Sequence, residues 1–150
     1  MQEVDLKLSE STSKFLYKAL GNQILRVFYD VYNELGQGFL ESVYQNAMAI
    51  ALRDAGLFIE SQCPIPVYFR EQLVGDFRAD IVVEKKVILE LKTGKAIDKS
   101  CEAQIMNYLR ATKIQVGYVL NFGPEPTFKR LVYSNERKKL PGFDMASDNS

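Results

Sequence analysis

Apolar residues recur at every third or fourth position in three stretches of the chain, which is the spacing that gives an α-helix one apolar face. These stretches cover residues 16–35, 40–51 and 97–112, and Gly56 follows the second of them. Glycine commonly ends a helix because it accepts the left-handed backbone that closes the last turn. The pattern predicts two consecutive helices and a third one later in the chain, each with its apolar face in the core.

Between and after these helices, the pattern changes to the alternation and short apolar runs that are typical of β-strands. The predicted strands cover residues 64–69, 73–83, 87–92, 116–122 and 128–133. Glu84-Lys85-Lys86 predicts a hairpin turn, and Pro64 and Pro66 suit the start or an edge of a sheet. A meander followed by a β-α-β crossover predicts an α/β sandwich, in which helices flank a mixed central β-sheet.

The length and composition fit one domain. The chain has 150 residues, of which 47% are hydrophobic and 25% are charged, and this suffices for a core that folds alone. We expect residues 1–133 to form the domain and residues 134–150, which have no period, to form a flexible C-terminal tail. The first ten residues lack the apolar stretch of a secretory signal, and no apolar run approaches the roughly 20 residues of a membrane helix. A cytoplasmic protein without a membrane partner is therefore expected.

The residue counts limit the chemistry. Nineteen basic residues balance nineteen acidic ones, which argues against a polycationic tail but leaves room for a local basic groove. The sequence contains no histidine, and this excludes a Ser-His-Asp triad, a Cys-His dyad and a His-ligated zinc site. Cys63 and Cys101 form no Cys-x-x-Cys pair. They favour a reducing compartment, in which both act as small buried apolar residues.

Two acidic residues face each other in the predicted meander. Alternation along residues 77–83 puts Asp80 on one face of its strand and puts Ala79 and Ile81 on the other. A three-residue turn between the two strands sets a register that places Asp80 directly opposite Glu90, with Cβ atoms roughly 5 Å apart. A register shifted by one residue would separate the two carboxylates onto opposite faces.

Facing carboxylates repel each other, so the pair needs a compensating charge. In a structural interpretation, Lys92 on the same face and Arg78 beside Asp80 neutralise the pair. In a functional interpretation, the carboxylates hold a divalent metal, and Lys92 orients or activates a water. The acidic residues alone give the two interpretations equal weight, because structural ion pairs also form such clusters. The otherwise apolar strand 87–92 favours the metal, since charges in such a strand usually have a partner or a function.

Asp80, followed by Glu90-Leu91-Lys92, resembles the active-site signature of the PD-(D/E)XK nuclease superfamily. Residues 38–44, Gly-Phe-Leu-Glu-Ser-Val-Tyr, form a Gly-x-x-Glu-x-x-Tyr motif. This motif resembles the small bacterial and archaeal GxxExxY family, which is placed within that superfamily. The segments that also resemble the family are residues 104–109 and 116–123. The resemblance extends over roughly residues 15–133 in one colinear order.

The resemblance implies a restriction-endonuclease-like fold and a metal-dependent nuclease with Mg²⁺ or Mn²⁺ as its cofactor. Asp80 and Glu90 would ligate the metal together with the backbone carbonyl of Leu91. Glu41 would complete the metal shell directly or through water, and Lys92 would polarise the attacking water and help to neutralise the transition state. Taken by position alone, Glu41 in the first turn of its helix is also favoured by the helix dipole.

Gln104, one helical turn before Tyr108, resembles the Gln-x-x-x-Tyr element that nuclease relatives place beside the metal site. The resemblance gives Gln104 a catalytic role, and a solvent-facing Gln104 is the structural alternative. We expect Tyr44 to pack in the core with its hydroxyl satisfied. Ala79 stands where the superfamily name has Pro, a position that relatives often replace.

The leading hypothesis is Mg²⁺-dependent hydrolysis of phosphodiester bonds, with DNA favoured over RNA. Basic residues near the motifs are most simply solvated surface charges, but together they could contact phosphates without reading sequence. The candidate nucleic-acid-binding residues are Arg78, Lys95, Tyr108 and Arg130. One alternative is a catalytically idle nucleic-acid-binding or protein-interaction module on the same fold. Another is a structural protein whose cations neutralise the carboxylates. A homodimer is also expected, because cutting two strands needs two active sites.

Overall fold

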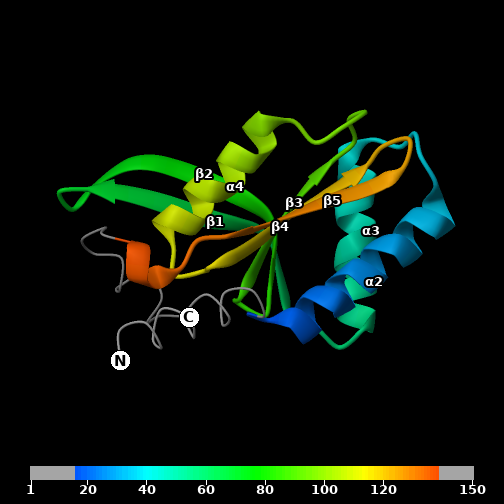
Figure 1. Ribbon diagram of the computed structural model, residues 1–150, viewed down its shortest axis with the longest axis horizontal. Coiled ribbons are helices and arrows are strands. Elements are labelled where there is room, and N and C mark those ends of the chain that lie inside the picture. Colours follow the sequence, from blue (N-terminus) through cyan, green and yellow to red (C-terminus); the bar gives the residue numbers. More distant parts are fainter. Residues whose placement is uncertain (1–15, 139–150) are drawn as a thin grey trace, which may run out of the picture.

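A computed structural model describes residues 16–138, which are built around one five-stranded sheet (Figure 1). The strands, in both chain order and sheet order, are β1 (Ile59–Phe69), β2 (Gln72–Val83), β3 (Val87–Lys92), β4 (Val116–Phe122) and β5 (Pro126–Val132). In this sheet β3 and β4 are parallel, and the other neighbouring strands are antiparallel. The parallel pair needs a crossover connection, which contains α4 (Lys99–Ala111). The mixed sheet with flanking helices confirms the predicted α/β sandwich.

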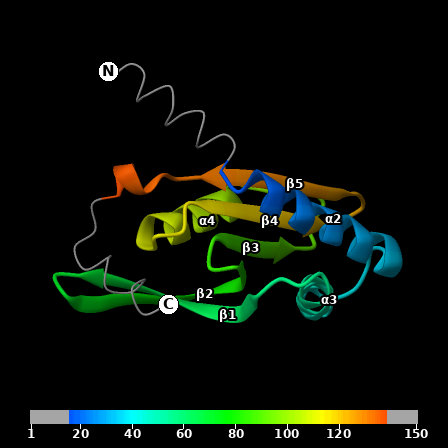
Figure 2. The ribbon, with the colours of Figure 1, turned by 90° about the horizontal axis from the view of Figure 1, so that it is seen from below.

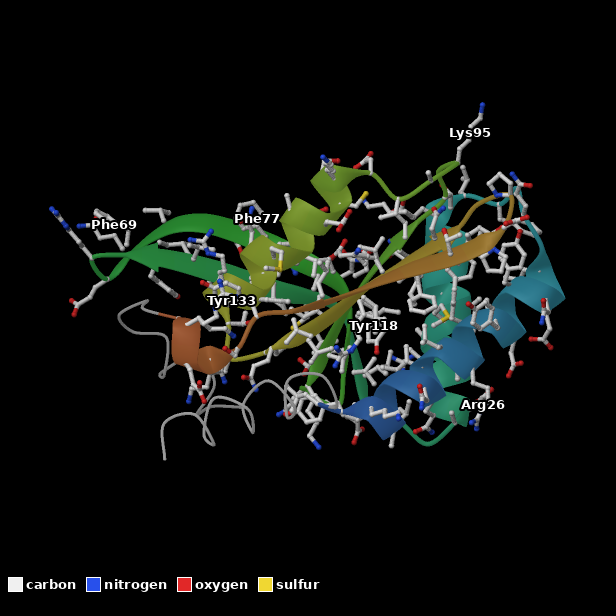
Figure 3. All side chains as sticks on the ribbon, in the orientation of Figure 1. Arg26, Phe69, Phe77, Lys95, Tyr118 and Tyr133 are labelled. Atoms are coloured by element: carbon white, nitrogen blue, oxygen red, sulfur yellow. The ribbon has the colours of Figure 1, made fainter. Side chains whose placement is uncertain are left out.

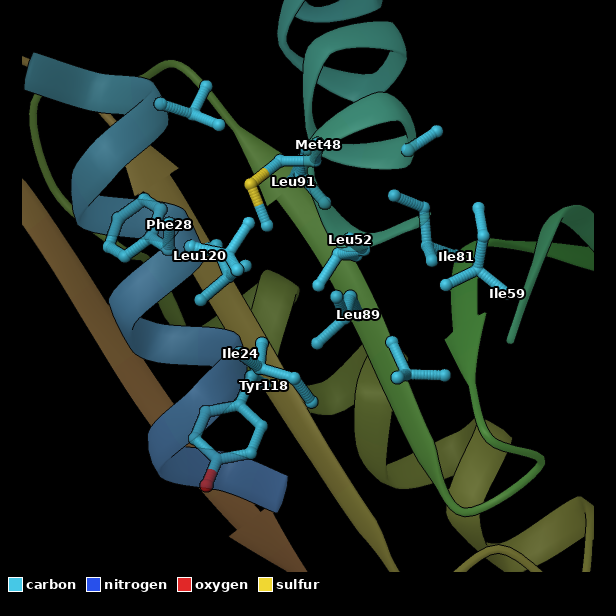
Figure 4. Packing of buried hydrophobic residues seen from close by; sticks show 14 of the residues in the cluster. Ile24, Phe28, Met48, Leu52, Ile59, Ile81, Leu89, Leu91, Tyr118 and Leu120 are labelled. Atoms are coloured by element: carbon cyan, nitrogen blue, oxygen red, sulfur yellow. The ribbon is translucent and has the colours of Figure 1, made fainter. Parts of the chain in front are cut away.

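Helices cover both faces of the sheet. α2 (Lys18–Leu35) and α3 (Glu41–Asp54) pack on one face, where their apolar sides meet alternate strand residues in a large buried cluster (Figure 4). α4 packs on the other face in a smaller cluster. β3 and β4 are therefore buried on both sides, as is typical of central strands in an α/β sheet.

The first strand differs from the prediction. β1 begins at Ile59 rather than at residue 64. The hydrophobic pattern does not indicate this start, because Ser61 and Gln62 are polar and exposed. The two prolines do lie in an edge strand, as predicted, because β1 is the first strand of the sheet. β5 likewise begins at Pro126 rather than at residue 128.

Alternation in β2 breaks at Ala79, and the predicted facing of this residue is wrong. Ile81 packs in the cluster under α2 and α3, whereas Ala79 packs in the cluster under α4. At this point Gln62 and Asp80 are both left out of the β1–β2 pairing, and Gln62 has a left-handed φ of 52°. Such a residue departs from the extended backbone on which alternation depends, so the residues on either side of it face different clusters.

The hairpin of β1 and β2 extends beyond the rest of the sheet (Figures 1 and 2). β2 pairs with β3 from Ile81 to Val83 alone. Residues 64–78 of the hairpin, called the arm below, therefore have no third strand beside them among residues 16–138. The arm ends in a two-residue turn at Arg70 and Glu71, whose φ angles are 49° and 66°.

The chain after β5 begins with an ordered turn. η1 (Asn135–Arg137) is a short 3-10 helix, and the ammonium of Lys138 donates hydrogen bonds to two backbone carbonyls just beyond α4, at 2.7 and 2.8 Å. Residues 139–150 of the predicted tail, and residues 1–15, lie outside the described residues. In the described part of the chain, no helix is long and apolar enough to cross a membrane.

Candidate functional site

The hairpin between β2 and β3 brings two carboxyl groups to the point where these strands separate. Its turn, residues 84–86, leaves Val83 paired with Val87, which is the register that the sequence predicts. The strand pairing ends one residue before Asp80 and Glu90. The two acids therefore lie at the mouth of the hairpin and next to the carboxyl end of β3.

Here the backbone ladder is replaced by hydrogen bonds between backbone amides and carboxylates. The N–H of Asp80 donates to Oε1 of Glu90 at 3.2 Å, and the N–H of Leu91 donates to Oδ2 of Asp80 at 2.8 Å. Glu90 is 3% exposed, and Asp80 is half-buried. Two strands thus hold the carboxyls against each other, and each carboxyl keeps lone pairs for a further partner.

Burial and mutual repulsion make it costly to ionise both carboxyls. Desolvation raises the pKa of Glu90, and the negative charge of Asp80 raises it further, to about 8. Burial also raises the pKa of Asp80, against the hydrogen bond from Leu91 that lowers it. The charge of Lys92 lowers both pKa values but does not restore them. Burial and mutual repulsion therefore disfavour ionisation of both carboxyls in the metal-free protein, and a bound cation would relieve the same repulsion.

Lys92 is the last residue of β3. It supplies positive charge near the carboxylates without forming an ion pair. Its side chain is half-buried, and no described carboxylate lies within ion-pair distance of its Nζ. The guanidinium of Arg78 does not pair with the carboxylates either, because its Nη1 donates a hydrogen bond to the backbone carbonyl of Gln62 at 3.2 Å. The described residues thus do not form the direct ion pairs of the structural interpretation, and the carboxylates remain open to an external cation.

Glu41 is the first residue of α3, and the charge of Asp80 affects its pKa. Burial raises its pKa, the charge of Lys92 lowers it, and the charge of Asp80 raises it. Among residues 16–138, no three His, Cys, Asp or Glu side chains lie close enough together to form a complete metal cage. Glu41 thus lies outside such a close cluster but within reach of the charges of Asp80 and Lys92.

Tyr44 shows how Glu41 is held in place. The ring of Tyr44 is fully buried and stacks on Phe122 of β4, with ring centroids 4.3 Å apart. Its hydroxyl donates to the carbonyl of Gly36, which confirms the expected core position with a satisfied hydroxyl. Gly38 has a φ of 116°, a conformation that side chains rarely adopt. The Gly-x-x-Glu-x-x-Tyr motif is thus a local structure that fixes the loop leading into Glu41.

α4 directs two more motif residues toward the pair. Nε2 of Gln104 donates to the hydroxyl of Tyr108 at 2.8 Å, and this hydroxyl donates to the carbonyl of Arg78 at 3.3 Å. Burial raises the pKa of Tyr108, and the charges of Glu90 and Asp80 raise it further. The side chains of Gln104 and Tyr108 therefore form a fixed polar edge beside the carboxylates.

Sequence reasoning missed Asn121, which fixes the chain just after Lys92. Asn121 is fully buried and lies opposite Lys92 in the parallel ladder. Its side chain accepts from the N–H of Gly94 at 3.0 Å and donates to the carbonyl of Gly94 at 2.9 Å and to Oγ1 of Thr127 at 3.3 Å. A Cβ added to Gly123 would collide with the Gly94 carbonyl. The available signal was an amide within an otherwise apolar strand, since a buried amide must find partners.

The predicted nucleic-acid-binding residues do not form one group. Arg78 and Tyr108 are joined beside the carboxylates, and Lys95 points into solvent from the loop that follows β3 (Figure 3). Arg130 lies on the other face of the sheet, where its Nη2 donates to the carbonyl of Leu16 at 3.0 Å, beside the cluster under α2. A nucleic acid at the carboxylates could thus reach the first three residues more directly than Arg130.

The donor set suits a hard divalent cation. Carboxylate and backbone carbonyl oxygens are the ligands that Mg²⁺ and Mn²⁺ prefer. Asp80 and Glu90 present such oxygens side by side, and the peptide of Leu91 is tied to Asp80 by its N–H. A cation would relieve the repulsion that raises the pKa of both carboxyls, so the residues present fit a bound metal.

Comparisons with known proteins bear on the family and the fold of the chain. A family model described as the PD-(D/E)XK nuclease superfamily matches residues 18–131, which contain all the site residues above. The mixed sheet with flanking helices is consistent with the restriction-endonuclease-like fold of that superfamily. No curated protein matches the chain. Among solved structures, the crystal structure of SSO0001 is similar at 16% identity and a TM-score of 0.48, over 62% of this chain and 50% of that one. The chain thus spans half the length of that protein.

Proposed function

Because the chain belongs to the PD-(D/E)XK nuclease superfamily, we propose that it is a metal-dependent nuclease that hydrolyses phosphodiester bonds of nucleic acid, with DNA as the favoured substrate. The observation that carries this proposal is the buried Asp80–Glu90 pair beside Lys92, which no described cation neutralises by direct contact. The anchored motif at residues 38–44 supports a place in the GxxExxY group.

Asp80 and Glu90 would hold Mg²⁺ or Mn²⁺ together with the carbonyl of Leu91. When bound, the ion would act as a Lewis acid that stabilises negative charge on the phosphate. Glu41 would complete the metal shell directly or through water, and its response to the charges of Asp80 and Lys92 supports this role. Since Glu41 forms no close cluster with the pair, contact through water fits better.

Lys92 would orient the attacking water and neutralise the charge that develops on the scissile phosphate. Its half-buried ammonium suits this role, because a charge that is partly removed from solvent acts strongly on its neighbours. Gln104 would orient the same water or a phosphate oxygen, held in place by Tyr108. By analogy with the superfamily, the water oxygen would bond to phosphorus as the P–O3′ bond breaks. The water would lose a proton to solvent and the leaving 3′ oxygen would take one up, so that the products are a 5′-phosphate and a 3′-hydroxyl.

Nucleic acid would approach from the side of α4 and the loop after β3. There Lys95 would contact a phosphate, and Arg78 and Tyr108 would line the path. Arg130 would take part only if the strand also reached the opposite face of the sheet. Cutting both strands of a duplex would require a homodimer with two active sites.

Cleavage of labelled single-stranded, duplex and branched DNA and RNA in Mg²⁺, Mn²⁺ or EDTA tests the proposal. Lys92→Ala is compared with Lys86→Ala, which removes an exposed lysine at the other end of β3. We expect metal-dependent cutting by the wild-type and Lys86→Ala proteins and at least about a 100-fold loss in Lys92→Ala. Equal cutting by all three proteins, or no cutting by any, would contradict the proposal.

Metal binding separates the nuclease from an idle binding module on the same fold. Mg²⁺ at about 100 times its dissociation constant should stabilise the wild-type protein by about 2.7 kcal/mol, which raises the melting temperature by several degrees. Asp80→Asn should lose most of this shift, whereas Asp76→Asn, on the exposed arm, should keep it. No shift at all would contradict the metal site and favour the idle module, which need not hold Mg²⁺.

A further inference from the structure

Two glutamines link α3 to β1 and have no role in the proposed mechanism. Gln45 of α3 lies one helical turn after Glu41, and its side chain hydrogen-bonds the Glu41 carboxylate. Nε2 of Gln62 in β1 donates to Oε1 of Gln45 at 3.0 Å. The backbone carbonyl of Gln62 in turn accepts from Nη1 of Arg78 in β2 at 3.2 Å. These contacts, called the glutamine bridge below, connect Glu41 to a residue two positions before Asp80.

The contacts of the glutamine bridge fix the orientation of the Gln45 amide. A glutamine amide accepts hydrogen bonds at its oxygen and donates them from its NH₂ group. Because Oε1 of Gln45 accepts from Gln62, Nε2 of Gln45 is the atom that donates to Glu41. A donor that is held in this direction favours one orientation of the Glu41 carboxylate. Hydrogen-bond partners of metal-ligating carboxylates orient their ligands in the same way.

Gln62 holds its end of the bridge in an unfavourable backbone conformation. Its φ of 52° lies in the left-handed region, which glycine accepts and glutamine rarely adopts. The Gln62 side chain and its bond to Gln45 are exposed, and an exposed hydrogen bond adds little to stability because water offers the same bonds. Strained residues of this kind concentrate at functional sites. The strain therefore points to a role of Gln62 other than support of the fold.

The glutamine bridge connects the two parts of the candidate metal site. Asp80 and Glu90 lie on β2 and β3, whereas Glu41 lies on α3. Gln62 and Asp80 are left out of the β1–β2 pairing at the same point, so the irregularity from which Gln62 reaches α3 lies beside Asp80. A shift of α3 against the hairpin would move Glu41 relative to the acidic pair, and the bridge opposes such a shift.

We propose that Gln45 and Gln62 are positioning residues, which hold the Glu41 carboxylate toward the metal site of Asp80 and Glu90. This inference rests on the proposed metal site and adds two residues that act on it through Glu41. Loss of such outer partners typically lowers metal affinity or activity by about 10–100-fold. Loss of the glutamine bridge should therefore weaken metal binding while the protein stays folded.

Two variants break the bridge from its two ends. Gln45→Met keeps the length of the side chain and removes its amide, and Gln62→Gly removes the side chain and accepts the left-handed φ. The melting temperature is measured as Mg²⁺ alone is added, and cleavage of labelled DNA is measured over the same range of Mg²⁺. We expect each variant to need at least about 10-fold more Mg²⁺ for half of the maximal effect. The double variant should need no more than either single variant, because both changes break one bridge.

Stability without metal separates positioning from support of the fold. In EDTA, Gln62→Gly should melt at or above the wild-type temperature, because glycine relieves the strain, although it binds Mg²⁺ more weakly. The matched control is Glu71→Gly, which replaces another left-handed residue of the same hairpin, with a φ of 66°, at its far turn. Asn46→Met is the control for Gln45→Met, since Asn46 is the next residue of α3 and is exposed. Both controls should keep the Mg²⁺ dependence of the wild-type protein.

Unchanged Mg²⁺ dependence in either folded variant would overturn the positioning role and leave the nuclease proposal in place. A Gln62→Gly protein that melts below the wild-type protein in EDTA would overturn it too, because the bridge would then support the fold. Wild-type protein that binds Mg²⁺ without cutting, with weaker binding in both variants, would contradict the nuclease and support the bridge. Wild-type protein that binds no Mg²⁺ would overturn the bridge together with the metal site. If Gln62→Gly does not fold, Gln45→Met decides by the same criteria.

Discussion

At the scale of the residue, the candidate site depends on two acids that water cannot fully solvate. Glu90 is 3% exposed and faces Asp80, and together burial and this neighbouring charge raise its pKa from 4.5 to about 8. In the unfolded chain, the same carboxyl titrates near its ordinary pKa. Between these pH values the folded, metal-free protein therefore binds more protons than the unfolded chain, and this difference makes stability depend on pH.

Without metal, the free energy of unfolding should fall as the pH rises from about 5 to about 8. A raised pKa stabilises the fold fully below the pKa of the unfolded state, and this contribution is lost as the pH passes through the pKa of the folded state. Glu90→Gln, which cannot ionise, should flatten the decline by up to about 1.4 kcal/mol per pH unit. Urea denaturation in EDTA at several pH values measures both proteins.

The control for this prediction is Glu125→Gln, which removes an exposed carboxyl in the turn before β5. It should keep the pH dependence of the wild-type protein. If Glu90→Gln also kept that dependence, Glu90 would ionise as easily in the folded protein as in the unfolded chain, and the electrostatic account of the site would be wrong.

The sequence places Asp80 opposite Glu90 because side chains alternate with a period of two, so one turn of known length fixes the whole register. Their role in catalysis stays a prediction. Asn121 could not be found in the same way. Its function depends on contacts with Gly94, in a loop that has no periodic pattern and whose path is decided by tertiary packing.

At the scale of the element, the loop between α2 and α3 determines the position of Glu41. Tyr44→Phe keeps the ring that stacks on Phe122 but removes the hydroxyl, which donates to Gly36 and accepts from the N–H of Phe39 at 3.3 Å. We expect a loss of about 0.5–1.5 kcal/mol in the free energy of unfolding, measured with urea. In an active protein, kcat should fall more than KM rises, because the loop leads into Glu41.

Tyr29→Phe is the matched control, since this tyrosine is 37% exposed on α2. Its stability and kinetics should equal those of the wild-type protein. Wild-type stability in Tyr44→Phe would mean that the hydroxyl does not hold the loop.

The turn at the end of the arm is strained, because two non-glycine residues adopt left-handed φ angles of 49° and 66° at Arg70 and Glu71. Such a conformation costs roughly 1–2 kcal/mol per residue. Glu71→Gly should therefore raise the free energy of unfolding by about 1 kcal/mol in urea. Glu125→Gly, which replaces a turn residue outside the left-handed region, should not. A lower stability of Glu71→Gly would contradict this turn geometry.

The same turn shows why parts of the fold escape prediction. Hairpin turns are recognised by Asn-Gly or Asp-Gly pairs, and Arg70-Glu71 has neither, so the two-residue turn was not visible although the meander that contains these two strands was predicted. The start of β1 was missed because Ser61 and Gln62 are exposed on an edge strand and carry no hydrophobic signal. The helices were predicted well, since each buries a continuous apolar face against the sheet.

At the scale of the whole molecule, the candidate site and the arm lie on elements of different stability. Glu90, Lys92 and Asn121 belong to β3 and β4, which are covered on both faces by helices. The arm is a two-stranded ribbon whose end leaves large apolar side chains exposed. Precise placement of catalytic groups calls for rigid elements, and the candidate site lies on them rather than on the arm.

Hydrogen exchange of the dilute protein should display this difference. Amides of β3 and β4 should exchange mainly through global unfolding, with the largest protection in the chain, because opening them exposes both core clusters. Amides between Tyr68 and Gly75 should exchange through local opening that costs no more than about 3 kcal/mol, since the arm has few buried contacts there. Mass spectrometry of peptic fragments measures both regions in one experiment. Equal protection of the arm and of the central strands would mean that the arm is covered within a single chain.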